Sequence, residues 1–167
     1  MGSIFRNPFI IHHRRVGVQT RDYAVSLALT DVEKELIDIL GVERHEFVGE
    51  RHYLLTGLVL SIFSELVRID GREEVELACK MTFLNLEQYF STRPGVDAEH
   101  GMWMMLQAIN NYYIQAPEKL ADRFLLAISH ERFKEISSSE IPGLVDLFKL
   151  YIANSINFLK KKIEDLR

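Results

Sequence analysis

Two adjacent histidines followed by two arginines give the segment FIIHHRRVGVQTRDY, residues 9–23, the highest density of chemically useful side chains in the chain. A neutral imidazole can bind a metal ion. An arginine pairs with carboxylates and other anionic groups. The same residues have a plain structural interpretation, in which His12, His13, Arg14 and Arg15 form a basic surface segment that leads into the first helix. Both interpretations stay open at this point.

Two further histidines occur in the segment VERHEFVGERHYLL, residues 42–55, which repeats Glu-Arg-His at an offset of seven residues. On one helix, His45 and His52 share a face but are separated by about 10.5 Å along the axis. That separation is too large for one metal ion, because each histidine ligand must approach it to about 2 Å. We therefore expect His52, at the edge of an apolar stripe, to be a hydrogen-bonded core residue.

Catalytic and metal-binding motifs give little support for an enzyme. Asp97 and His100 have the three-residue spacing of a carboxylate–histidine ligand pair in di-iron bundles, but the chain contains no Glu-x-x-His motif, which those bundles also need. Asp97 is equally well placed to cap a helix that begins at residue 98. The chain also lacks a glycine-rich phosphate loop, a nucleophile elbow and a His-Glu-x-x-His motif. We expect a non-enzymatic protein.

The order His13-Arg-Arg-Val16-Gly17-Val18, with Tyr23 a few positions on, resembles the proximal segment of the globin-coupled sensor family. With the two helices expected after it, the resemblance covers roughly residues 9–70. It implies a globin-like fold in which His13 is the proximal iron ligand of a haem and Tyr23 lines the same pocket. In that family about half of the globin precedes this segment. Here residues 72–167, or a partner chain, would have to supply the opposite wall.

Composition and charge limit the classes of protein to which the chain can belong. The chain has 167 residues, of which 47% are hydrophobic, and this is enough for one domain with a real core. The net charge is −4 and the 20 basic residues are scattered, which argues against nucleic-acid binding. The single cysteine, Cys79, excludes an internal disulfide and is expected to be a small buried residue. The longest nearly apolar stretch, Tyr53–Phe63, is too short to cross a membrane. We expect a cytoplasmic protein.

The hydrophobic pattern predicts helix after helix in a single all-α domain over residues 1–167, either globin-like or a helical bundle. Residues 1–18 are expected to be extended or irregular, because Pro8 and Gly17 break helices. Thr30 and Glu33 form a capping box, and Gly41 supplies the stop for that helix. About six helices are expected, and the later ones are placed at residues 46–69, 72–90, 98–115, 118–136 and 140–166, of which 46–69 should be the central helix.

The last helix carries an apolar seam with a period of seven residues, formed by Val145, Ile152, Leu159 and Leu166. Such a seam is either the core face of a bundle or the start of a coiled coil. We expect a sensory, regulatory or protein-interaction module, which forms a homodimer or binds a partner protein through this helix and needs no cofactor. The alternative is a domain that binds haem or another apolar small ligand, with His13 as the only metal-binding residue.

Overall fold

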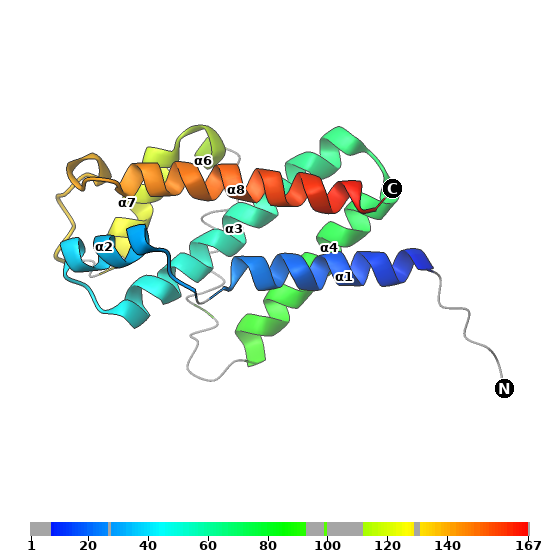
Figure 1. Cartoon of the computed structure of the whole chain (residues 1–167), viewed down its shortest axis with the longest axis horizontal. Helices are drawn as coiled ribbons and strands as arrows, with labels where there is room; N and C mark the ends of the chain where they lie inside the picture. The colour runs from blue at the N-terminus through cyan, green and yellow to red at the C-terminus, as the bar shows by residue number, and fades with distance from the viewer. Residues whose placement is uncertain (1–7, 27, 93–98, 100–111, 129–130, 167) are drawn as a thin grey trace.

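The computed structural model describes residues 8–26, 28–92, 99, 112–128 and 131–166, and it is all-α within them, as the sequence predicts. Figure 1 shows how the helices are arranged. In chain order they are α1 (Pro8–Ala24), α2 (Asp31–Leu40), α3 (Arg44–Asp70), α4 (Glu73–Thr92), α6 (Tyr112–Gln115), α7 (Pro117–Ala127) and α8 (Leu144–Glu164), with a 3₁₀ turn η1 (Ser138–Glu140) before α8.

The boundaries of α2 confirm the capping prediction. The Thr30 side chain accepts a hydrogen bond from the Glu33 backbone N–H, and the Glu33 side chain accepts one from the Thr30 backbone N–H. Gly41 ends the helix with φ of 64°, a left-handed conformation that favours glycine. Local sequence therefore determines where this helix begins and ends.

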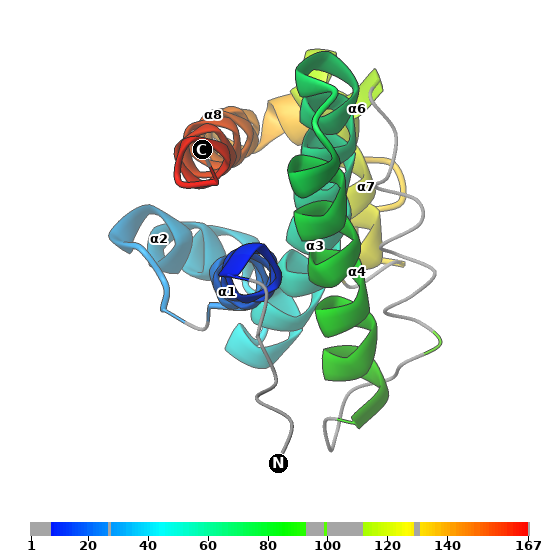
Figure 2. The same ribbon diagram turned by 90° about the vertical axis from the view of Figure 1, so that its right-hand side faces the viewer.

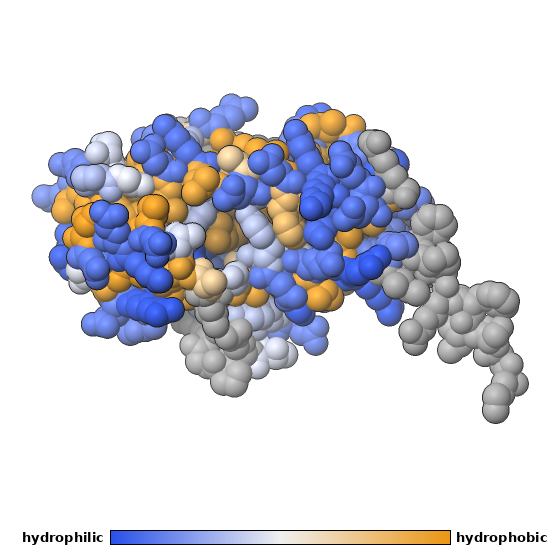
Figure 3. Space-filling view, viewed as in Figure 1, coloured by the Kyte–Doolittle hydropathy of each residue, from blue (hydrophilic) through white to orange (hydrophobic). Residues whose placement is uncertain are grey.

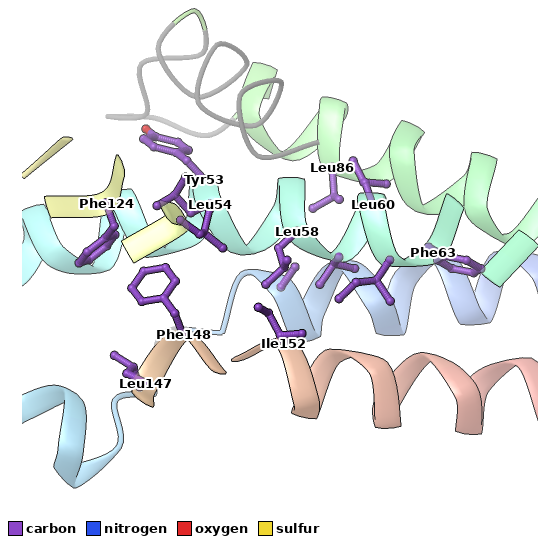
Figure 4. Close-up of a cluster of buried hydrophobic side chains, with 14 of the residues drawn as sticks. Tyr53, Leu54, Leu58, Leu60, Phe63, Leu86, Phe124, Leu147, Phe148 and Ile152 are labelled. Atoms are coloured by element: carbon purple, nitrogen blue, oxygen red, sulfur yellow. The ribbon is translucent and has the colours of Figure 1, made fainter. Parts of the chain in front are cut away.

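The long helix α3 forms the centre of the fold, as predicted. Fourteen of its residues are buried. It contacts α1, α4, α7 and α8, and in Figure 2 the helices α1 and α8 lie on one side of it and α7 on the other (Figures 1 and 2). In Figure 4, Leu54 and Leu58 of α3 lie among Phe124 of α7 and Phe148 and Ile152 of α8. By length and composition alone α3 is also apolar enough to cross a membrane, but 61% of its most apolar window is buried inside the protein.

The expectation of an irregular segment over residues 1–18 is wrong from residue 8 onward, because α1 begins there. Pro8 occupies the first position of the helix, where its missing N–H has no intrahelical partner to lose. Gly17 lies inside the helix because α4 crosses it closely. A Cβ atom at this position would stand 2.8 Å from the Met81 Cβ atom. Close packing therefore outweighs the intrinsic helix penalty of glycine, which is about 1 kcal/mol.

Two of the later helices are shorter than predicted. The helix expected over 118–136 ends at Ala127, where Ile128 adopts extended backbone so that it and Phe133 are both buried in the core. The helix expected from 140 begins at Leu144, because Gly143 has φ of 82° and interrupts the helical path after η1. Of the helix expected over 98–115, the described part is α6. The predicted cap Asp97 and its neighbour His100 lie outside the described residues.

The seven-residue seam of α8 faces the core of its own chain. Ile152, Leu159 and Leu166 are buried there, and Val145 is half-buried against them. The structure therefore corresponds to the bundle-face interpretation of this seam. A dimer formed through these four residues would have to remove them from the core.

Candidate functional site: a polar groove between α1 and α8

One face of α1 is closed by α4 and holds His13. His13, Gly17, Thr20 and Ala24 recur at helical spacing along this face, and all four are buried. His13 is only 4% exposed, and its Nε2 atom has no hydrogen-bond partner among the described residues. Gly17, one turn further along the same face, lies so close to α4 that a Cβ atom there would be 2.8 Å from the Met81 Cβ atom.

A different face of α1 carries Tyr23 toward α8. Its hydroxyl lies 3.1 Å from the Ser155 Oγ atom, and its ring stacks on Phe158 with the centroids 4.4 Å apart. Burial raises the pKa of Tyr23 above its ordinary value, and the hydrogen bond to Ser155 opposes this rise only in part. His13 and Tyr23 are ten residues apart, about 15 Å along the helix axis. The structure places the two predicted haem-site residues on different faces of α1, with His13 buried and Tyr23 against α8.

Beyond Tyr23, the antiparallel helices α1 and α8 diverge around a polar cavity of about 330 Å³. Figure 1 shows the first turns of α1 running beside the last turns of α8. We call this cavity the α1–α8 groove, and it is lined by His12, Arg15, Val16, Gln19, Lys162 and Asp165. Hydrophilic side chains also dominate this end of the face seen in Figure 3. Of the predicted basic segment, His12 and Arg15 line the groove, whereas His13 faces α4 and Arg14 is exposed.

The groove is positively charged although the chain as a whole carries −4. Arg15 donates from Nη2 to the Nδ1 atom of His12 over 2.9 Å, which leaves the imidazole proton on Nε2. Across the groove, the ammonium of Lys162 lies over the Phe158 ring, 5.4 Å from its centroid. Asp165 is the single acidic residue of the lining. Within the described part of the chain, neither Arg15 nor Lys162 forms an ion pair.

A second cluster of charged residues is buried where α2, α3 and α8 meet. Arg51 donates from Nη1 to the Glu33 Oε2 atom over 2.5 Å, and the two residues are only 3% and 2% exposed. Tyr151 of α8 donates to the same oxygen over 2.8 Å. The Thr30 backbone and hydroxyl donate to the other oxygen of Glu33. Every acceptor position of this carboxylate is therefore in use, and we call Glu33, Arg51 and Tyr151 the buried cluster.

The pKa shifts within the buried cluster follow from these contacts. Burial alone would raise the pKa of Glu33, but the hydrogen bonds from Arg51, Thr30 and Tyr151 and the Arg51 charge outweigh it, and the pKa falls below its ordinary value. Burial and the adjacent Glu33 charge raise the pKa of Tyr151 far above its ordinary value. Tyr151 thus stays protonated and donates a hydrogen bond from its hydroxyl to Glu33.

The other donors of Arg51 hold the connection between α1 and α2. They bind the backbone carbonyls of Ser26 and of Ala28, the latter over 3.2 Å, and the neighbouring His52 places its Nε2 atom 3.0 Å from the Ser26 carbonyl. These carbonyls belong to non-helical backbone and need partners when they are buried. The buried cluster therefore serves the fold, and His52 is the hydrogen-bonded core residue that was predicted.

A third feature is an apolar cavity of about 390 Å³ between α3 and α4. Burial raises the pKa of the Cys79 thiol above its ordinary value, which keeps it neutral and matches the apolar role expected for it. Cys79 is half-buried rather than fully buried. The cavity is lined by Leu60, Ser64, Cys79, Lys80, Phe83 and Leu84.

Sequence reasoning found half of the groove and missed the rest. It singled out His12 and Arg15 but not Lys162, because no local pattern indicates that Lys162 lies near α1. Arg51 carried a usable signal, since an arginine inside an apolar helical run needs a buried acid. No group of three or more potential metal ligands occurs among the described residues.

Comparisons with protein-family models, with curated proteins and with solved structures find no match to this chain. Its function therefore has to be argued from the sites themselves.

Proposed function

We propose that the chain is a non-enzymatic regulatory or interaction module that recognises a negatively charged group in the α1–α8 groove. The observation that carries the proposal is that Arg15 and Lys162, from two helices distant in sequence, line one open cavity, and that neither forms an ion pair among the described residues. The buried cluster gives the contrast, because its cation is fully matched by Glu33. Cations that are held together and left unmatched favour an anion from outside the chain.

The groove supplies charge and hydrogen bonds but no nucleophile. Among the described residues, its lining contains no hydroxyl or thiol side chain. Its one imidazole, His12, already accepts from Arg15 at Nδ1, so this lone pair is not free to remove a proton from a substrate. Recognition without chemistry is the function that such a lining supports best.

Recognition at the groove requires one chain only. Ile152 and Leu159, which a coiled-coil dimer would place at its seam, contribute to the core of the single chain. We therefore place the contact with a partner or ligand at the groove and not at that seam.

A second candidate function, binding of an apolar small ligand, is favoured by the cavity between α3 and α4. Its volume of about 390 Å³ falls within the range of small-ligand sites.

Haem bound through His13 would in contrast require α1 to separate from α4. We expect purified protein mixed with equimolar haemin to give no Soret band that depends on His13. A sharp band that is lost in His13→Ala would restore the haem proposal.

The main proposal is tested by titrating isotope-labelled protein with inorganic phosphate, sulfate, citrate and a glutamate-rich peptide at constant ionic strength. We expect saturable chemical-shift changes confined to residues 12–19 and 158–166 for at least one of these probes. The double variant Arg15→Ala/Lys162→Ala should abolish them. The matched control Arg14→Ala/Lys161→Ala removes the same charge from positions outside the groove lining and should retain them. Equal losses in both variants, or shifts that never saturate, would contradict the proposal.

A further inference from the structure

We infer that the anionic group taken by the α1–α8 groove is the phosphate of a small phosphate monoester that also carries a hydroxyl or ammonium group. This inference rests on the proposed function and assigns the class of its ligand. It follows from the number of cations in the groove, from the acid placed beside them and from the size of the cavity.

The first step is the match between the cations and the charge of the ligand. Arg15 and Lys162 are both permanently charged at neutral pH, and the Nε2–H of His12 adds a third donor from the same lining. A phosphate monoester carries about −1.5 to −2 charges and three strong acceptor oxygens at pH 7. A carboxylate has only two oxygens, so it offers fewer acceptors to these three donors than a phosphate does. Arginine and lysine are also the usual residues for phosphate binding.

The second step concerns Asp165, which lines the same groove. Its carboxylate repels a bare anion but accepts a hydrogen bond, and the Gln19 amide beside it can both donate and accept. A ligand that places a hydroxyl or an ammonium group beside Asp165 donates a hydrogen bond to this carboxylate, and the contact replaces the repulsion. Inorganic phosphate and sulfate bring no alcohol hydroxyl or ammonium group to this position, so they should bind more weakly than the ester.

The third step is size. A cavity of about 330 Å³ lies near the lower end of the range for small-ligand sites. It has room for a phosphorylated molecule of a few carbon atoms and not for a helix of another protein. The same phosphate chemistry occurs on the headgroup of an anionic lipid, and the experiment must therefore separate a free ligand from a membrane surface.

A ligand of this kind would link the two helices. Toward the C-terminal end of α1, Tyr23 already joins the two helices by meeting Ser155 and Phe158 of α8. Phosphate oxygens shared by Arg15 and Lys162 would add a second link about two turns further along each helix. Bound ligand should therefore slow amide exchange in the last turns of α8, because it favours the docked arrangement.

The experiment is a calorimetric titration at constant ionic strength with glycerol 3-phosphate, inorganic phosphate and glycerate. We expect glycerol 3-phosphate to bind at least about tenfold more tightly than glycerate and more tightly than inorganic phosphate. Arg15→Ala/Lys162→Ala should weaken it by about tenfold or more, whereas Arg14→Ala/Lys161→Ala should change it less than about twofold. Asp165→Asn should reduce the preference for the ester over inorganic phosphate. Far-UV circular dichroism checks that every variant is folded.

The outcomes separate this inference from the proposed function. Tighter binding of glycerate than of glycerol 3-phosphate, still dependent on Arg15 and Lys162, would overturn the phosphate assignment and leave anion recognition intact. Binding to phosphatidic acid vesicles without binding to glycerol 3-phosphate would overturn the assignment to a small free ligand. A groove that binds none of these probes, nor any of the wider anion panel, would overturn both proposals.

Discussion

The two ends of α8 use similar residues for opposite purposes. Near its beginning, Tyr151 reaches the ion pair between Glu33 and Arg51, which is buried and fully hydrogen-bonded at the carboxylate. Near its end, Lys162 and Asp165 face Arg15 and His12 across an open groove. Both ends combine an arginine with an acid, so residue type alone does not distinguish them. Burial and saturation of the hydrogen-bonding groups do.

The energetics explain this division. A charge taken out of water destabilises the fold by several kcal/mol unless it is paired, so Arg51 requires Glu33 where it lies. Arg15 stays exposed, and leaving it without an acid costs the fold little. An unmatched cation is therefore tolerated in the groove but not in the buried cluster, and in the groove a ligand can gain from it.

The largest effect is expected when the buried cluster loses its cation. Arg51→Met leaves the Glu33 carboxylate buried without its charge partner and should lower the free energy of unfolding by about 3–5 kcal/mol. Arg15→Met, the same change in the groove, should stay within about 0.5 kcal/mol. Urea denaturation measures both. Comparable losses in the two variants would remove the distinction between the ends of α8.

A second contrast lies within α1, between its closed face and its groove face. Gly17→Leu inserts a side chain where even a Cβ atom would be 2.8 Å from Met81. We expect a loss of about 1–3 kcal/mol from overpacking. Gln19→Leu points the same side chain into the groove and should change stability by less than about 0.5 kcal/mol. A stable Gly17→Leu protein, again by urea denaturation, would show that the interface with α4 is looser than the structure has it.

The tyrosines that attach α8 give a smaller and graded effect. Tyr151→Phe removes a hydrogen bond to the charged carboxylate of Glu33 and should cost about 1.5–2 kcal/mol. Tyr23→Phe removes only a neutral bond to Ser155 and keeps the stack on Phe158, so about 0.5–1 kcal/mol is expected. Thermal unfolding of both variants checks the order. The reverse order would mean that α8 is held mainly at its groove end.

What the sequence predicted correctly depended on local patterns. Thr30, Glu33 and Gly41 define α2 within a dozen residues, and the apolar run after residue 46 defines the central helix. The extent of α1 was missed because Gly17 acts through its contact with Met81, which no local pattern contains.

The candidate site illustrates the same limit more strongly. Arg15 and Lys162 are 147 positions apart, and their approach depends on how α8 packs across α3. The basic segment attracted attention for its histidines, yet the residue that the resemblance favoured, His13, lies against α4, while its neighbours His12 and Arg15 line the groove. The sequence singled out this segment but predicted neither its helix nor the face on which each residue lies.

The pH dependence of stability should show the smallest effect of the four, because it concerns one carboxylate among many. The pKa of Glu33 is lower in the folded chain than in the unfolded chain, where it has its ordinary value near 4.3. The stabilisation is therefore complete above that value and is lost as the pH falls through the folded pKa. We expect Glu33→Gln to be clearly less stable than the native chain at pH 6 and to approach it in acid. The difference should change by at most about 1.4 kcal/mol per pH unit, the limit for one proton.

Glu65 is the matched control for this measurement, because its pKa is also lowered, by Arg68 on the next turn, but at the surface of α3. Exposed pairs are screened by salt, whereas the buried pair is reached by few ions. Added salt should therefore remove any pH-dependent difference between Glu65→Gln and the native chain and leave that of Glu33→Gln in place. If salt removed both, the carboxylate of Glu33 would be open to solvent. The contrast between the two ends of α8 would then have to be explained by something other than burial.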